Sequence, residues 1–95
     1  MQKQKIFITR RISEAGIRLL EQKYEVDIWQ EDLPPAPAEL RKRAQNCCAI
    51  LSMLSDKIDV EVMEAIGKNL KVISNYAVGF DNIEVAEATR RGIAV

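Results

Sequence analysis

Residues 71–83 read KVISNYAVGFDNI, and this stretch indicates the fold more clearly than any other part of the chain. It begins with a short apolar run, typical of a buried parallel strand, and continues into a loop that contains Gly79. Glycine lets a ligand approach the backbone closely and permits an unusual dihedral angle. A strand followed by a loop of free backbone amides is where α/β proteins bind small anions, so this loop is a candidate site.

A helix is expected directly after this loop. Asp81 and Glu84 have the spacing of a capping box, while Phe80 and Val85 have the spacing of a hydrophobic staple. Gly92 follows two arginines and should end the helix. The pattern therefore predicts the positive end of a helix dipole just beyond the loop.

Apolar, β-rich runs alternate with amphipathic stretches along the whole chain, at intervals of roughly twenty residues. This alternation is typical of repeated βα units and a parallel sheet. We expect one domain, residues 1–95, with a flavodoxin-like, doubly wound α/β fold in three layers, α/β/α, and strand order 2-1-3-4-5. The expected strands are residues 5–9, 25–29, 48–52, 71–74 and 93–95.

Three further helices fit between these strands. The first should be capped by Ser13 and pack through an apolar stripe of Ile17, Leu19 and Leu20. The second should cover residues 38–45, after a proline-rich connection. The third should run from a cap at Asp59 to a stop at Gly67 and bury Val62, Met63 and Ile66.

The composition argues against several classes of partner. Fourteen basic and fourteen acidic residues cancel, so no long-range field should attract nucleic acid or an anionic membrane. No apolar run is long enough to span a bilayer and no secretory signal is recognisable, so we expect a soluble, cytoplasmic chain. Cys47 and Cys48 are adjacent and histidine is absent, so we expect neither a disulfide between them nor a metal site. Both cysteines should be core or strand-edge residues, and Cys47 is the better candidate for an exposed, reactive thiol.

Other known uses of this architecture fit poorly. A phosphate-accepting receiver domain needs acidic residues after its first strand, where this chain has Arg10 and Arg11. A loop for a flavin phosphate needs hydroxyls and glycines at the same place, and only Ser13 follows. Dinucleotide binding needs closely spaced glycines, but the four glycines here are at least twelve residues apart. No Ser/His or Cys/His pair is available for nucleophilic catalysis either.

The residues alone leave two interpretations of the loop at residues 77–79 open. It is either a helix-entry turn, with Gly79 present for backbone reasons, or a set of amides that binds a carboxylate. Asp81 is more readily explained as a helix cap than as a catalyst.

Three segments closely resemble one known family, namely residues 50–59 (ILSMLSDKID), 70–83 (LKVISNYAVGFDNI) and 91–95 (RGIAV). They are similar to the D-isomer-specific 2-hydroxyacid dehydrogenases, and within that family most similar to glyoxylate/hydroxypyruvate reductases. The opening residues 6–10 (IFITR) also fit, although Ser13 stands where many members have proline. The resemblance covers essentially the whole chain, and its most specific part is the G-x-D motif with the preceding strand.

The resemblance implies that the chain is the amino-terminal segment of the family's substrate-binding domain. In that family, the loop matched by Val78 and Gly79, which here includes Ala77, binds the substrate carboxylate through backbone amides. The turn matched by Met53 and Leu54 forms an apolar wall near the substrate. The substrate of the full-length enzyme would be a small 2-oxoacid or 2-hydroxyacid.

The family's NAD(P)H site and its catalytic arginine, histidine and glutamate would lie in a domain that follows Val95. We therefore expect no cofactor and no catalytic residue in this chain, and no activity of the chain alone. Surface that the rest of the enzyme would cover should be left open, which favours a homodimer. The alternative is a free-standing flavodoxin-like module, natural or engineered, with a structural or self-association role.

Overall fold

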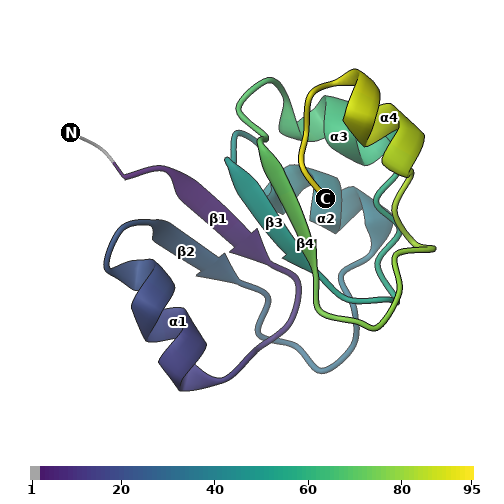
Figure 1. The fold of residues 1–95 in the computed structure, drawn as a ribbon. Coiled ribbons are helices and arrows are strands. Elements are labelled where there is room, and N and C mark those ends of the chain that lie inside the picture. The colour runs from purple at the N-terminus through teal and green to yellow at the C-terminus, as the bar shows by residue number, and fades with distance from the viewer. Residues whose placement is uncertain (1–2) are drawn as a thin grey trace.

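The computed structural model describes residues 3–95, so residues 1 and 2 of the expected domain lie outside the described part. Strands and helices alternate, and all strand pairs are parallel, in the order β2-β1-β3-β4 (Figure 1). The elements are β1 (Lys5–Ile8), α1 (Glu14–Glu21), β2 (Glu25–Ile28), α2 (Pro37–Arg43), β3 (Ala49–Ser52), α3 (Val60–Ile66), β4 (Val72–Asn75) and α4 (Val85–Arg90). The predicted α/β class and the order of these strands are thus confirmed.

The prediction of a fifth strand at residues 93–95 is wrong, because these residues do not form a strand in the structure. Only Ala94 pairs with the sheet, through an isolated parallel bridge to Val72 beside β4. The amide of Ile73 donates to the carbonyl of Ala94 at 2.8 Å, and the amide of Ala94 donates to the carbonyl of Lys71 at 2.9 Å. The preceding residue, Ile93, donates instead to Ala88 at the end of α4. Ile93 thus belongs to the helix ending, and the pairing beside β4 is limited to the bridge at Ala94.

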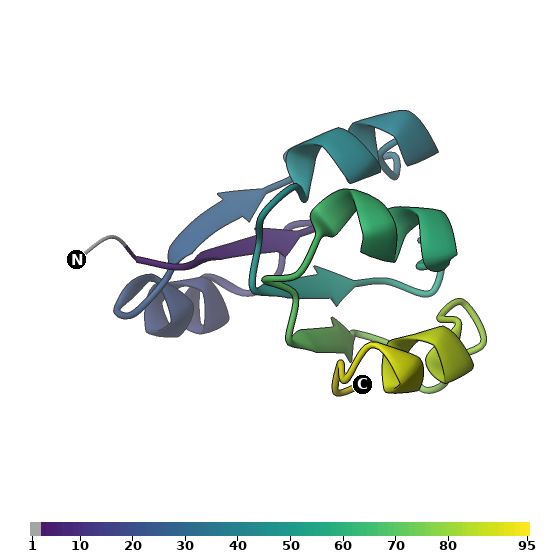
Figure 2. The ribbon, with the colours of Figure 1, turned by 90° about the horizontal axis from the view of Figure 1, so that it is seen from above.

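The sheet has two unequal faces (Figures 1 and 2). One face is covered by α2, α3 and α4, and among the described elements the other face is covered by α1 alone. Phe7, Ile50 and Ile73, from three adjacent strands, point into the larger core, where they are essentially inaccessible to solvent. Ile6 and Ile8 alternate with Phe7 and point to the α1 side. The α1 side is therefore the thinner of the two helical layers.

Most of the predicted helix boundaries are confirmed because their signals are local. The Ser13 hydroxyl accepts from the Gly16 amide, and the Asp59 carboxylate accepts from the Val62 amide at 3.0 Å. Gly67 ends α3 with φ of 96°, a conformation that side chains with a Cβ rarely adopt. The α2 helix starts one residue earlier than predicted, at Pro37, since proline suits the first turn.

Leu19 does not belong to the buried stripe of α1. Its side chain is 67% exposed, while Ile17 and Leu20 are half-buried. No residue of α1 is fully buried. Because α1 lies alone on its side of the sheet in residues 3–95, it has no neighbouring helix there to cover a third apolar position.

The expectation of an exposed, reactive Cys47 is also wrong. The side chain is fully buried in the larger core, and loss of solvent raises the pKa of Cys47 to about 11. Burial also raises the pKa of Cys48. Both cysteines are free thiols, and neither is poised to form a thiolate.

In the described part of the chain, no helix is long and apolar enough to cross a membrane.

Candidate functional site

The candidate site lies at the edge of the sheet where the strands end. In a parallel sheet all carboxyl ends meet at one edge. Here that edge brings together the residues after β1, the turn at residues 53–56 after β3, and the loop at residues 76–84 after β4 (Figure 1). The segments predicted to hold ligand are therefore neighbours in the fold.

Ala77, Val78 and Gly79 form the exposed tip of the loop after β4. Within residues 3–95, no protein acceptor receives a hydrogen bond from their backbone amides. The amide of Tyr76, one residue earlier, still donates to the carbonyl of Ser52 at 2.7 Å. The loop thus leaves the sheet ladder at Tyr76, and its next three amides have no acceptor within residues 3–95.

Gly79 does not have the unusual dihedral angle that its position suggested. The glycines with positive φ are Gly67 and Gly92. A Cβ built on Gly79 would meet no protein atom within 4 Å. Neither backbone strain nor packing therefore requires glycine here, and the space beside its Cα is open to an incoming group.

The predicted start of α4 at Asp81 is wrong. The helix begins at Val85, its N-cap Glu84 makes no side-chain cap bond, and the Glu84 carboxylate instead accepts from the Val60 amide at 2.9 Å. The reason is a competing pairing: the amide of Ile58 donates to Asn82 at 2.8 Å, and the amide of Glu84 donates to Ile58 at 3.0 Å. Residues 80–84 thus separate the loop tip from the helix. Any anion affinity of the loop must come from its own amides rather than from the helix dipole.

Two asparagines connect the loop with the turn after β3. The Asn82 amide group donates to the carbonyls of Met53, at 3.0 Å, and Asp56, at 2.8 Å. The Asn75 amide group donates to the carbonyl of Gly79 at 2.8 Å and to Asn82 Oδ1 at 2.9 Å. The side chains of Asn75 and Asn82 therefore hydrogen-bond to the backbone of both the loop after β4 and the turn after β3.

The buried carboxylate of Asp56 joins the same turn to the end of β1. Asp56 is only 4% exposed, and its Oδ2 accepts from the Thr9 hydroxyl and from the Met53 amide, the latter at 2.8 Å. Arg10 lies 3.6 Å from Asp56 Oδ1 and donates to Ser55 Oγ at 2.8 Å. The ends of β1 and β3 are thus tied together.

Met53 and Leu54 begin this turn. Met53 is half-buried, whereas Leu54 is 57% exposed. Further exposed apolar side chains on the neighbouring loop are Tyr76, Val78 and Phe80. The edge therefore combines free amides with apolar side chains, as a site for a small organic anion requires.

Sequence reasoning missed Asp56, Asn75 and Asn82 as parts of this arrangement. Asn75 is the last residue of β4, and Asp56 and Asn82 lie in the connections that follow β3 and β4; polar residues at such positions were the available signal. Their partners are up to 47 positions away in the chain, as for Thr9 and Asp56. Spacing alone could not identify them.

The residues present do not fit a nicotinamide dinucleotide. Its pyrophosphate needs a glycine-rich turn at a strand-to-helix junction. Of the four glycines, Gly16 lies within α1 against Ile12, and the other three are isolated from one another. The described residues also contain no cluster of side chains that could hold a metal ion.

The fold and these loops define a class of protein: an α/β domain with an open parallel sheet whose ligand loops lie at the carboxyl ends of the strands. Residues 6–95 match the family described as D-isomer specific 2-hydroxyacid dehydrogenase, catalytic domain, and the chain belongs to this family.

Curated relatives support the same family assignment. The chain is 45% identical over 93 residues to a glyoxylate reductase of Korarchaeum cryptofilum, and 47% identical over 93 residues to one of Pyrococcus furiosus. These alignments cover 98% of this chain but only 28% and 27% of the relatives. A solved structure from Thermus thermophilus matches with a TM-score of 0.85 and 37% identity, over 94% of this chain and 28% of that one. The chain thus spans about a quarter of the length of the proteins it matches.

Proposed function

We propose that this chain supplies the substrate-binding loops of a glyoxylate reductase-like enzyme. In this proposal, the amides of Ala77, Val78 and Gly79 bind the carboxylate of a small 2-oxoacid, and Met53 and Leu54 form an apolar wall beside it. The observation that carries the proposal is the set of three consecutive amides that have no acceptor within residues 3–95, next to a glycine with open space. Several oriented amides can hold a carboxylate without any charged side chain.

The same proposal assigns the remaining chemistry to other parts of a full-length enzyme. Reduction of a 2-oxoacid needs a hydride donor and a proton donor, and NAD(P)H would be held outside residues 1–95. We propose that the whole chain forms one substrate-binding unit, that it works in the cytoplasm, and that it has no activity alone. Hydride transfer by the purified chain would contradict this division of roles.

The test of the proposed site is a two-dimensional amide NMR titration with oxalate, an inert analogue of glyoxylate. We expect selective shifts at Val78 and Gly79. The variant Gly79→Ala should change the free energy of unfolding by no more than about 0.5 kcal/mol, since the new methyl group meets no protein atom. It should nevertheless abolish the shifts, because the methyl group occupies the space through which the carboxylate approaches.

Gly16→Ala is the matched control. It makes the same chemical change within α1, remote from the loop, and should bind oxalate as the unmodified chain does. Binding that survives Gly79→Ala would remove residues 77–79 from the site. A titration of the unmodified chain with no shifts at these residues would count against the half-site itself.

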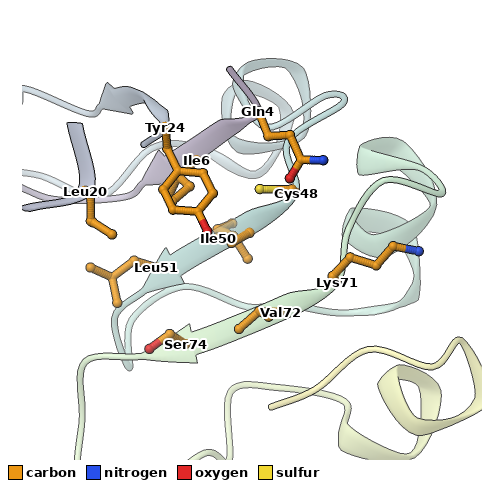
Figure 3. Close-up of a pocket in the computed structure, with 11 residues that line it drawn as sticks. Gln4, Ile6, Leu20, Tyr24, Cys48, Ile50, Leu51, Lys71, Val72 and Ser74 are labelled. Atoms are coloured by element: carbon orange, nitrogen blue, oxygen red, sulfur yellow. The ribbon is translucent and has the colours of Figure 1, made fainter. Parts of the chain in front are cut away.

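We also propose that the isolated chain forms a homodimer through the thin side of the sheet. A groove of about 380 Å³ lies there, next to α1. Figure 3 shows Leu20, Tyr24, Leu51 and Val72 around it, from α1, the β2 entry, β3 and β4. Apolar groups dominate this surface, and a net charge of zero provides no general repulsion between two copies.

Sedimentation across a concentration range tests the dimer. We expect the apparent mass to rise with concentration, and Val72→Lys to shift the chain to monomer because it places a charge in the groove. Leu33→Lys is the control, since Leu33 is 76% exposed and does not line the groove. A monomer at all concentrations would favour the free-standing module instead.

A further inference from the structure

We propose that Asn75 and Asn82 are positioning residues that hold the two halves of the substrate site at a fixed distance and orientation. This inference rests on the function proposed above. The pair contacts no substrate in this proposal. It acts through the backbone of the loop at residues 77–79 and of the turn at residues 53–56.

Asn82 closes the turn. Its amide group donates to the carbonyls of Met53 and Asp56, which are the first and last residues of the turn. The amide of Asp56 also donates to the carbonyl of Met53 at 2.9 Å, so the turn is closed by backbone and side chain together. A side chain from the neighbouring loop thus sets where Met53 and Leu54 lie.

Asn75 orients the loop. Its amide group donates to the carbonyl of Gly79 at 2.8 Å. In a trans peptide the carbonyl and the following amide point in opposite directions, and the chain has no cis peptide among its described residues. The amide of Phe80 therefore points away from Asn75, and the tip of the loop cannot turn over without breaking this bond.

The two side chains are also joined to each other and to β3. Asn75 Nδ2 donates to Asn82 Oδ1, and Asn82 Nδ2 lies 3.2 Å from Asn75 Oδ1. The Ser52 hydroxyl donates to Asn75 Oδ1 at 2.9 Å. Both asparagines are half-buried, so water competes only partly for these bonds. A carboxamide is required at position 82, because a carboxylate of the same shape cannot donate to two carbonyls.

The first test needs no substitution. In the unmodified chain, the side-chain amide protons of Asn82 should exchange with solvent several-fold more slowly than those of Asn69. Asn69 is the internal reference, since its amide group makes one exposed, 3.5 Å contact with the carbonyl of Asn46. Equal exchange at the two side chains would overturn the proposal.

The second test compares Asn82→Asp with the control Asn69→Asp. Amide ¹H–¹⁵N NOE values should fall in both segments, residues 53–56 and 76–80, in Asn82→Asp and in neither segment in Asn69→Asp. Oxalate affinity should fall about tenfold in the first variant, as the loss of the loop's preferred orientation implies. If only residues 76–80 become mobile, the pair does not connect the two segments and the proposal is wrong.

These readouts separate the two proposals. If the unmodified chain binds no oxalate, the proposed substrate site fails, while the exchange and NOE measurements still decide whether the asparagines join the segments. If Asn82→Asp does not fold, Asn82→Ser replaces it, because serine also removes the second donor without adding a charge. Unchanged NOE values in a folded Asn82 variant would overturn the positioning role.

Discussion

Replacing Phe7 by alanine is expected to lower the free energy of unfolding by about 3–5 kcal/mol. Phe7 is fully buried in the middle of β1, with Asp27 of β2 on one side and Ile50 of β3 on the other. Its ring packs in the larger core, and the Arg43 guanidinium lies 5.7 Å from the ring centre. Removing the ring opens a cavity that strands on both sides prevent from collapsing.

A loss of this size is a large part of the total for a chain of 95 residues, because domains are typically stable by about 5–15 kcal/mol. Urea unfolding followed by circular dichroism measures it, at one fixed protein concentration because association would add to stability. Leu19→Ala is the control, since Leu19 is 67% exposed and should change stability by less than about 0.5 kcal/mol. Similar losses for both variants would mean that the core is not centred on β1.

The sequence was sufficient for the features that depend on local signals. The alternation of apolar runs predicted the parallel strands and their order as far as β4. The caps at Ser13 and Asp59 and the stop at Gly67 involve partners within a few residues, so they could be located by spacing. Gly92 likewise ends α4, with φ of 75° and its amide donating to Thr89.

The failures share a physical cause, which is that each outcome depends on parts of the chain distant in sequence. The capping-box spacing at Asp81 was a genuine local signal, but the pairing of Ile58 with Ile83 displaced the helix start. Leu19 has an apolar side chain in an amphipathic helix, yet none of the other described helices lies beside α1 to bury it. The predicted fold was enough to place residues 53–54 and 77–79 at the same edge of the sheet. It could not identify Asn82, whose bonds to the turn join residues that are 29 and 26 positions apart in the sequence.

Replacing Asp56 by alanine should destabilise the chain by about 3 kcal/mol or more, the second large effect that we expect. The substitution leaves the Thr9 hydroxyl, which is inaccessible to solvent, and the Met53 amide without their acceptor. It also leaves Arg10 beside a site with no opposite charge. A buried polar group without a partner lowers the free energy of unfolding, because water cannot replace the lost hydrogen bond.

Asp56→Asn separates the two contributions. A carboxamide oxygen in place of Oδ2 can still accept from both Thr9 and Met53. The charge beside Arg10 is gone, so the loss of stability should lie between those of alanine and the unmodified chain. Asp32→Ala, at an exposed aspartate whose side chain has no hydrogen bond or ion pair among residues 3–95, controls for a general effect of removing one negative charge. Urea unfolding gives all three values. If Asp56→Ala were no more destabilising than Asp32→Ala, the buried carboxylate would not tie β1 to the turn after β3, and the orientation of Met53 would have to depend on Asn82 alone.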